Sequence, residues 1–292
     1  MSLYPRDVSL RPLEAISSRS FTVLQFNVLA DGLSGLREDK GGFILAPGSS
    51  LSWSFRSLLL LEEILRFSPD VVCLQEVDHF DDWFEPELRR HGFFGLFAPK
   101  PHSPCLFVND KPDGCAVFFK ESSFFMLSHS VLNYAQSNQV ALIVDLQHKE
   151  SDQYVRIACT HLKATKNASG EVLREEQAKI LCASIGSGPI VVCGDFNATP
   201  DSHEYPALAY KAMRNHGFDS AYCIDGKEPE YTTWKVRSEK ESKHTIDYIF
   251  YTPSTLQVLG TVNAPVEMEE CALPSLRYPS DHIALIAKMQ WV

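Results

Sequence analysis

The chain has 292 residues, of which 45% are hydrophobic and 22% charged, the composition of an ordinary globular protein. Its 27 basic and 37 acidic side chains give a formal net charge of -10, which argues against tight non-specific binding to a long nucleic acid, because Lys and Arg supply most of that affinity. A local basic pocket on an acidic body suits a small phosphorylated substrate better. No apolar stretch is long enough to span a membrane.

Strand-like runs rich in Val, Ile, Phe and Tyr recur along the whole chain, separated by Gly, Pro, Asp and Ser. In chain order we expect strands at 21–28, 70–77, 114–119, 139–146, 154–161, 189–195, 245–251, 256–262 and 282–290. Apolar positions spaced by three and four predict fewer helices. These helices are expected at 53–67, 82–91, 171–185 and 202–216, with loops at 35–50 and 101–113.

This pattern of many strands and few helices favours two packed sheets covered by helices, an α/β sandwich. Neither a repeat nor a linker divides the chain. We therefore expect one catalytic domain over 21–292, preceded by a poorly ordered extension over 1–20.

The eight cysteines form no CxxC pair and no cluster at zinc spacing, and several lie inside apolar runs. A disulfide framework is improbable at this length, so we expect a reducing compartment, the cytoplasm. Residues 1–20 lack the apolar core of a secretion signal. Three arginines there are compatible with the remnant of a mitochondrial targeting segment, although Asp7 and Glu14 count against it.

Polar side chains suited to catalysis stand at the ends of several of these strands. They are Asn27, Glu76, His161, Asp195 and Asn197, with His282 opening the last strand. Carboxylates and amides on rigid strand tips are what metal-assisted phosphate chemistry requires. Taken singly, each has an ordinary explanation: an Asx turn after the strand for Asp195 and Asn197, a buried core imidazole for His161, a solvated carboxylate for Glu76.

Six motifs in order along the chain carry a resemblance. Asn27 is followed by LQEVD, THLK, GDFN, TIDYI with Asp247, and PSDH. This set resembles the endonuclease/exonuclease/phosphatase superfamily over nearly the whole chain. Segments such as FAPKPHSPC, PDGCAVFF, YTTWKVR and LPSLRYPSDH are similar to a branch related to the carbon-catabolite-repressor deadenylases.

The resemblance implies a role for each strand-end residue. Glu76 would be the direct Mg²⁺ ligand, with Asn27 orienting it. His282 would be held by Asp247 and act on water or on the phosphoryl oxygens. The remaining residues would act on the water and the phosphate: Asp195 by orienting or deprotonating the water, Asn197 by donating to the oxygen that gains charge, and His161 by contacting the phosphate.

Basic residues decide between the substrates that this superfamily allows. Lys100, Lys163 and Arg237 match basic positions that the similar branch uses around the phosphates of NADP. Where that branch has an Arg, this chain has Thr165, so either Lys166 supplies the charge one position later or the contact is weaker.

Three functions follow as hypotheses. The resemblance implies a monomeric, magnesium-dependent phosphatase that removes the 2′-phosphate of NADP(H) by in-line attack of water. Because no GxGxxG follows a strand and opens a helix, the dinucleotide would be a substrate and not a Rossmann-bound cofactor. A 3′–5′ poly(A) exoribonuclease is the alternative, disfavoured by the charge of -10. A catalytically silent binding protein is least expected, since every motif is retained.

Overall fold

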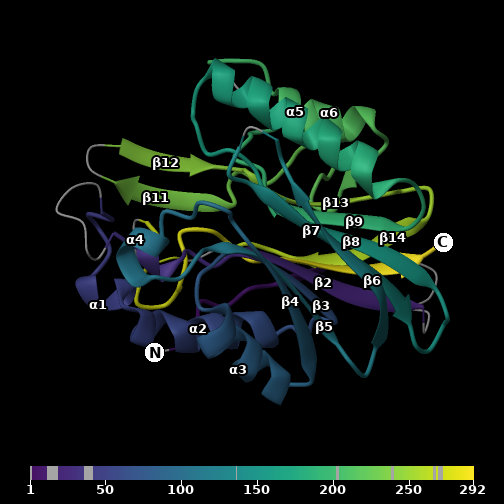
Figure 1. Cartoon of the computed structure of the whole chain (residues 1–292), viewed down its shortest axis with the longest axis horizontal. Coiled ribbons are helices and arrows are strands. Elements are labelled where there is room, and N and C mark those ends of the chain that lie inside the picture. The colour runs from purple at the N-terminus through teal and green to yellow at the C-terminus, as the bar shows by residue number, and fades with distance from the viewer. Residues whose placement is uncertain are drawn as a thin grey trace.

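A computed structural model describes residues 2–11, 19–35, 42–135, 137–201, 204–237, 240–265, 268 and 272–292. Two mixed sheets pack face to face, which confirms the α/β sandwich (Figure 1). The first sheet has the order β1 (Val8–Leu10), β14 (Leu256–Val262), β15 (Leu285–Trp291), β2 (Ser20–Asn27), β3 (Val71–Val77), β5 (Gly114–Lys120), β4 (Phe93–Pro99). The second has the order β10 (Asp219–Ser220), β13 (Asp247–Tyr251), β9 (Ile190–Asp195), β8 (Tyr154–His161), β7 (Val140–His148), β6 (Phe124–Asn133).

Both faces of the central strands are buried, which explains their continuous apolar runs. Along β3, Val71 and Cys73 face the other sheet, while Val72 and Leu74 face helices. The outer layers are α2 (Trp53–Leu65) and α3 (Glu85–Arg90) on the first sheet, and α5 (Ala168–Ile185) and α6 (Leu208–Asn215) on the second (Figure 1).

The strand pairing brings the polar strand ends to one edge of the sandwich. β2 runs parallel to β3, and β8 runs parallel to β9 with His161 beside Asp195. β13 is antiparallel to β9 and begins with Asp247 opposite Asp195. The two sheets are joined at this edge by hydrogen bonds from Asn27 Nδ2 to Asp195 Oδ2, 3.0 Å, and from Gln25 Nε2 to Asp247 Oδ1, 2.9 Å.

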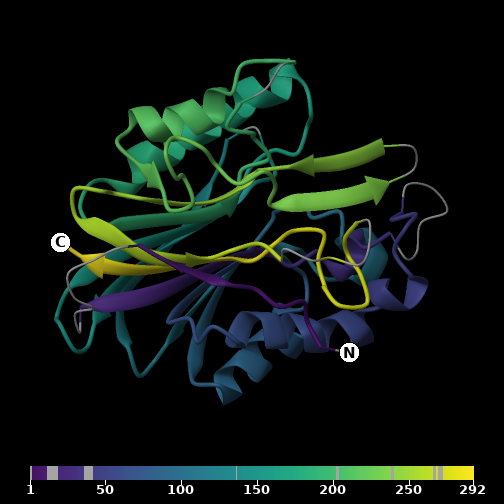
Figure 2. The ribbon, with the colours of Figure 1, turned by 180° about the vertical axis from the view of Figure 1, so that it is seen from behind.

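The first residues of the chain differ from the expected poorly ordered extension. Residues 2–11 run along the first sheet, where β1 pairs with β14 (Figure 2). Tyr4 is fully buried, and Arg6 forms a buried ion pair with Glu63 of α2. These burials recruit the segment into the fold, and only 1 and 12–18 of the expected extension lie outside the described residues.

Several other elements differ from the expectations. The helix expected over 202–216 spans Leu208–Asn215, after Pro206, while 202 and 203 lie outside the described residues. Of the two expected loops, 35–50 ends in the short helix α1 (Gly48–Leu51), with 36–41 outside the described residues, and 101–113 contains α4 (Leu106–Asn109). The short turn η1 (Asp31–Leu33) precedes the first loop, and η2 (Phe80–Phe84) leads directly into α3. Strands β4 and β6 and the hairpin of β11 (Thr233–Arg237) and β12 (Lys240–His244) were not expected. β6 is an exposed edge strand and β12 is highly charged, so neither shows the apolar pattern of a buried strand.

Among the described residues, none of the helices combines the length and hydropathy needed to cross a membrane.

Candidate active site

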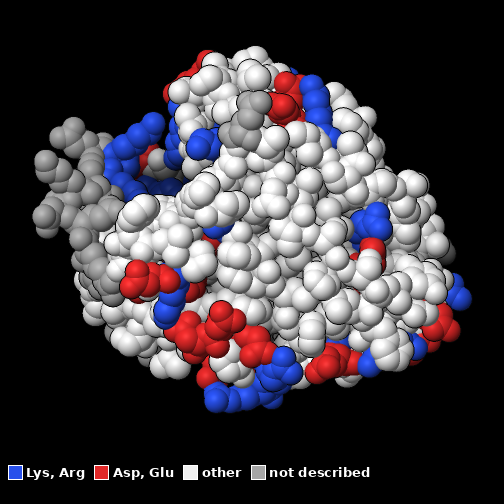
Figure 3. All heavy atoms as spheres, viewed as in Figure 1, with Lys and Arg blue, Asp and Glu red and all other residues white. Residues whose placement is uncertain are grey.

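A cleft of about 480 Å³ opens where the polar strand ends meet. All but two of the strand-end and basic residues singled out from the sequence line it. They are Glu76, Lys100, His161, Lys163, Lys166, Asp195, Asn197, Arg237 and His282. The two others, Asn27 and Asp247, lie buried directly behind it. Lys and Arg side chains gather over the β11–β12 hairpin beside this hollow (Figure 3).

Glu76 reaches the cleft because β3 bulges at this residue. Its pairing with β5 shifts register between Gln75 and Val77, and Glu76 has a φ of +57°. A non-glycine residue in the left-handed region costs about 1 kcal/mol or more, and such residues cluster at functional sites. Asn27 Nδ2 donates to Oε1 at 3.0 Å and the Ala30 N–H donates to Oε2 at 3.2 Å, so the carboxylate has a fixed orientation.

Asp195 lies at the centre of the site. Its Oδ2 accepts from Asn27 Nδ2, and its Oδ1 accepts from the Asn197 N–H at 2.9 Å. The Asx turn expected at GDFN is therefore present, with Asn197 at a φ of +50°. That turn aims the Asn197 amide at the Leu162 carbonyl, 3.1 Å, and at His161 Nε2, 3.1 Å.

His282 is held as a cation by surrounding carboxylates. Its Nδ1 lies 2.9 Å from Asp247 Oδ2, and its Nε2 lies 3.8 Å from both Asp195 Oδ2 and Asp281 Oδ2. Burial lowers the pKa of His282, but Asp247 and Asp281 outweigh it and raise the pKa to about 9. At neutral pH the imidazolium is a hydrogen-bond donor on both nitrogens and not a base.

This raised pKa predicts a pH-dependent contribution of His282 to stability. A group whose pKa is raised on folding stabilises fully below its unfolded value, near 6.5, and loses that contribution as the pH rises through about 9. The free energy of unfolding of the wild type minus that of His282→Gln should therefore fall by about 3 kcal/mol between these pH values. Urea unfolding of both proteins at several pH values measures it, and a constant difference would contradict the charged state.

The environment of His161 favours the neutral imidazole, in contrast to that of His282. Burial and the nearby Lys100 ammonium group lower the pKa of His161 to about 4, so it is neutral at pH 7. With Asn197 Nδ2 donating to Nε2, the proton resides on Nδ1. That Nδ1 is buried and has no hydrogen-bond partner among the described residues. A buried donor in this state is a candidate contact for an anion.

The basic side of the cleft is only partly neutralised by the protein. Lys100 is buried and donates to Asp113 Oδ2. Arg237 lies over the Phe43 ring, 4.2 Å from its centroid, and its NH2 reaches the Leu33 carbonyl at 3.4 Å. Lys163 and Lys166 project from the loop after β8, and Lys166, not Thr165, lines the cleft.

Sequence reasoning missed Lys235 and left Asp281 without a firm role. Lys235 Nζ donates to Asp281 Oδ2 at 2.5 Å, next to His282. Burial lowers the pKa of Lys235, but Asp281 raises it more, so the pair is ionised. A strand over 233–237 would have revealed Lys235, because alternate residues share a face and Arg237 was already a candidate.

Two groups of side chains bring potential metal ligands within 4.8 Å of one another. They are Glu76, His161 and Asp195, and Asp195, Asp247 and His282. In the second group His282 is protonated and its Nδ1 bonds to Asp247, so it is a poor ligand. The first group faces the cleft and offers two carboxylates, the hard oxygen donors that Mg²⁺ prefers. The residues at Glu76 therefore fit a magnesium ion.

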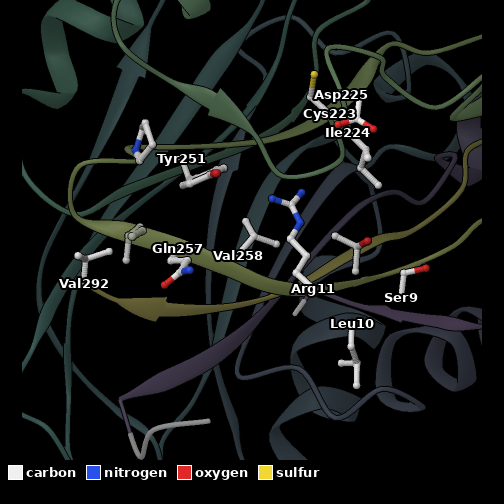
Figure 4. Close-up of a pocket in the computed structure, with 13 residues that line it drawn as sticks. Ser9, Leu10, Arg11, Cys223, Ile224, Asp225, Tyr251, Gln257, Val258 and Val292 are labelled. Atoms are coloured by element: carbon white, nitrogen blue, oxygen red, sulfur yellow. The ribbon is translucent and has the colours of Figure 1, made fainter. Parts of the chain in front are cut away.

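A larger depression of about 880 Å³ lies elsewhere and has a different character. Arg11 extends across it toward the loop that carries Cys223 and Asp225 (Figure 4). Arg11 also donates to the Ala221 carbonyl at 2.6 Å, so it serves to hold β1 against that loop. None of the strand-end residues lines this depression, and we assign the chemistry to the cleft.

Known proteins resemble this chain in sequence and in structure. The model of the Endonuclease/Exonuclease/phosphatase family matches residues 24–282. Nocturnin of Mus musculus is 41% identical over 303 residues, 97% of this chain and 68% of that protein. The structure of the human Nocturnin catalytic domain with bound sulfate anion superposes with a TM-score of 0.78 at 35% identity, covering 98% of this chain and 97% of that one. These findings confirm the resemblance inferred from the motifs.

A 3′-5′-exoribonuclease subunit is also similar. The CCR4-Not complex 3′-5′-exoribonuclease subunit Ccr4 of Candida albicans is 30% identical over 337 residues, which cover 95% of this chain and 42% of that protein. Membership of the family alone therefore does not distinguish a phosphomonoester substrate from a phosphodiester substrate.

Proposed function

Because the chain belongs to the endonuclease/exonuclease/phosphatase family and is a hydrolase, we propose that it removes the 2′-phosphate of NADP(H), giving NAD(H) and inorganic phosphate. The observation that carries this proposal is the crowding of cations around one small cleft. Lys100, Lys163, Lys166, Lys235 and Arg237 line about 480 Å³ on a protein of net charge -10. Such a concentration of charge suits a compact, multiply phosphorylated molecule. The sulfate in the human Nocturnin structure is consistent with an anion site in this family.

In the proposed reaction a water attacks the 2′-phosphorus in line with the leaving ribose oxygen. Asp195, whose two oxygens are fixed by Asn27 and Asn197, orients this water and accepts its proton. Imidazolium Nε2–H of His282 donates to a phosphoryl oxygen as charge develops. The P–O bond to the ribose breaks, the leaving 2′-oxygen takes up a proton from solvent, and Asp195 returns the proton that it accepted to solvent, so one water is consumed per phosphate released.

The neutral donors complete the electrostatic environment. The Asn197 amide donates to the Leu162 carbonyl and to His161 Nε2, and we infer that it exchanges the bond to neutral His161 for one to a phosphoryl oxygen as the substrate binds, without adding charge. Glu76, held by Asn27, would bind Mg²⁺, which when present supplies positive charge to the phosphate as a Lewis acid. The basic residues hold the other phosphates of the dinucleotide.

A 3′–5′ exoribonuclease acting on poly(A) is the second candidate, since the similarity to the Candida albicans subunit extends over 95% of the chain. The same donors could act on a phosphodiester. The net charge of -10 disfavours a long RNA, because each phosphate bound outside the cleft would meet little compensating charge.

One preparation tests both candidates. Purified protein with Mg²⁺ is given NADPH, with phosphate release measured, and in parallel a 3′-adenylated RNA, with its length measured on a gel. Glu76→Ala serves as the control for contaminating enzymes. We expect phosphate release that disappears in the variant, and RNA of unchanged length. Shortened RNA with untouched NADPH would replace the phosphatase proposal by the exoribonuclease.

A further inference from the structure

We propose that Arg174, a buried residue of α5, positions the basic loop over 162–167 so that Lys163 and Lys166 face the cleft before any substrate arrives. Arg174 is a positioning residue: it does not line the cleft, and it acts through the backbone of the loop. The inference rests on the proposed function only for the identity of the anion that the loop binds.

The guanidinium group of Arg174 fastens the loop at two points. NH1 donates to the Lys163 carbonyl at 2.8 Å and to the Thr165 carbonyl at 2.6 Å. The side chain is fully buried, and Glu171 on the same helix balances its charge, with Nε to Oε2 at 2.9 Å. The other Glu171 oxygen accepts from the Ala209 N–H of α6 at 2.9 Å. The Arg174–Glu171 ion pair therefore connects the loop to α5 and α6, the two helices that cover the second sheet.

Two further contacts fix the loop at the same place. Gln177, about one turn along α5, accepts from the Lys163 N–H at 3.1 Å through Oε1. Gly170 packs so closely that an added Cβ would lie 2.1 Å from the Thr165 oxygen. The near end of the loop is held to the catalytic strands, because the Leu162 N–H donates to the Asp195 carbonyl at 2.9 Å. Both the N–H and the carbonyl of Lys163 are therefore hydrogen-bonded to α5, which fixes the backbone of this residue beside the cleft.

Electrostatic repulsion explains why such an anchor is needed. Burial and the nearby ammonium groups of Lys235 and Lys240 lower the pKa of Lys166. Without an anion between them, these like charges push the loop and the β11–β12 hairpin apart. An anchored loop keeps them facing one another, so the cost of assembling the cationic pocket falls on folding and not on substrate binding.

The test compares Arg174→Met with Lys179→Met. Lys179 lies on the same helix and forms an exposed ion pair with Glu175, so its loss removes one cation from α5 without touching the loop. Inorganic phosphate is the probe, with its Kd measured by calorimetry, beside KM and kcat for NADPH. For Arg174→Met we expect the phosphate Kd and the KM to rise about tenfold, with kcat nearly unchanged. Hydrogen exchange of the Lys163 amide should accelerate. Lys179→Met should behave as the wild type.

Equal phosphate affinity in folded Arg174→Met and the wild type would overturn the inference, as would an equal loss in Lys179→Met. If Arg174→Met does not fold, Gln177→Met takes its place, because it removes the bond to the Lys163 N–H alone from this loop. A rise in its phosphate Kd supports the anchor, and an unchanged Kd refutes it. A wild type that binds phosphate but leaves NADPH intact would refute the proposed function and leave the anchor standing.

Discussion

Replacing Glu76 by Gln is expected to lower turnover about 10³-fold while leaving the fold intact. The Gln amide keeps the size of the side chain and one oxygen for Asn27, but it removes the negative charge that would hold a metal ion. The loss should appear in kcat and in the metal concentration needed for half-maximal activity. Steady-state phosphate release at increasing Mg²⁺ measures both quantities.

A matched control comes from Asp78, which lies two residues further along the chain. Asp78 accepts from the N–H groups of Asp31 and Gly32 and from Asn109, so it braces the loop beside the cleft without lining it. Asp78→Asn should reduce stability and leave the metal dependence as in the wild type. If Glu76→Gln retained the wild-type metal requirement, the magnesium ligand would have to be another residue.

The catalytic edge of the fold was predictable from local sequence, and the basic side only in part. The strands that end in Asn27, His161 and Asp195 are buried on both faces, so their apolar runs and abrupt polar ends are visible in the sequence. The parallel pairs β2–β3 and β8–β9 then bring these ends to one edge.

The position of Glu76 could not be read from the strand pattern. In an uninterrupted strand, side chains alternate, and Gln75 and Glu76 would point to opposite faces. The bulge that redirects Glu76 depends on its pairing with β5, which lies almost forty residues further along the chain. Such long-range pairing leaves no local signal.

The hairpin of β11 and β12 was missed for a different reason. β12 contains no apolar residue, and β11 is only five residues long, with Trp234 and Val236 alternating with Lys235 and Arg237, in a hairpin that projects from the sandwich (Figure 1). The short alternation around Lys235 was therefore overlooked, although Lys235 lines the cleft as the predicted Arg237 does. The anchoring of the 162–167 loop was equally hidden, since Arg174 reads from sequence as a solvated helix residue and is in fact fully buried.

Replacing Asp247 by Asn should lower kcat by about 10³- to 10⁴-fold, although Asp247 itself never touches the cleft. The carboxylate accepts from His282 Nδ1 at 2.9 Å, from Thr232 Oγ1 at 2.7 Å and from Gln25 Nε2 at 2.9 Å. The Asn amide has one acceptor oxygen and one NH2 group, so the NH2 group would face one of these donors without forming a hydrogen bond. It also removes the negative charge that contributes most to the raised pKa of His282.

The pH profile separates this electrostatic role from a structural one. In the wild type, His282 keeps its proton up to about pH 9, so on the alkaline side kcat falls only above that value. In Asp247→Asn the pKa of His282 moves toward its ordinary value near 6.5, so the residual kcat should already decline through neutral pH. Thr232→Val is the matched control, because it removes a neutral donor to the same carboxylate and preserves the charge. It should lower kcat modestly and leave the profile in place. A residual activity in Asp247→Asn with the wild-type profile would mean that the proton on His282 takes no part in the reaction, and Lys235 would then have to supply the charge that stabilises the transition state.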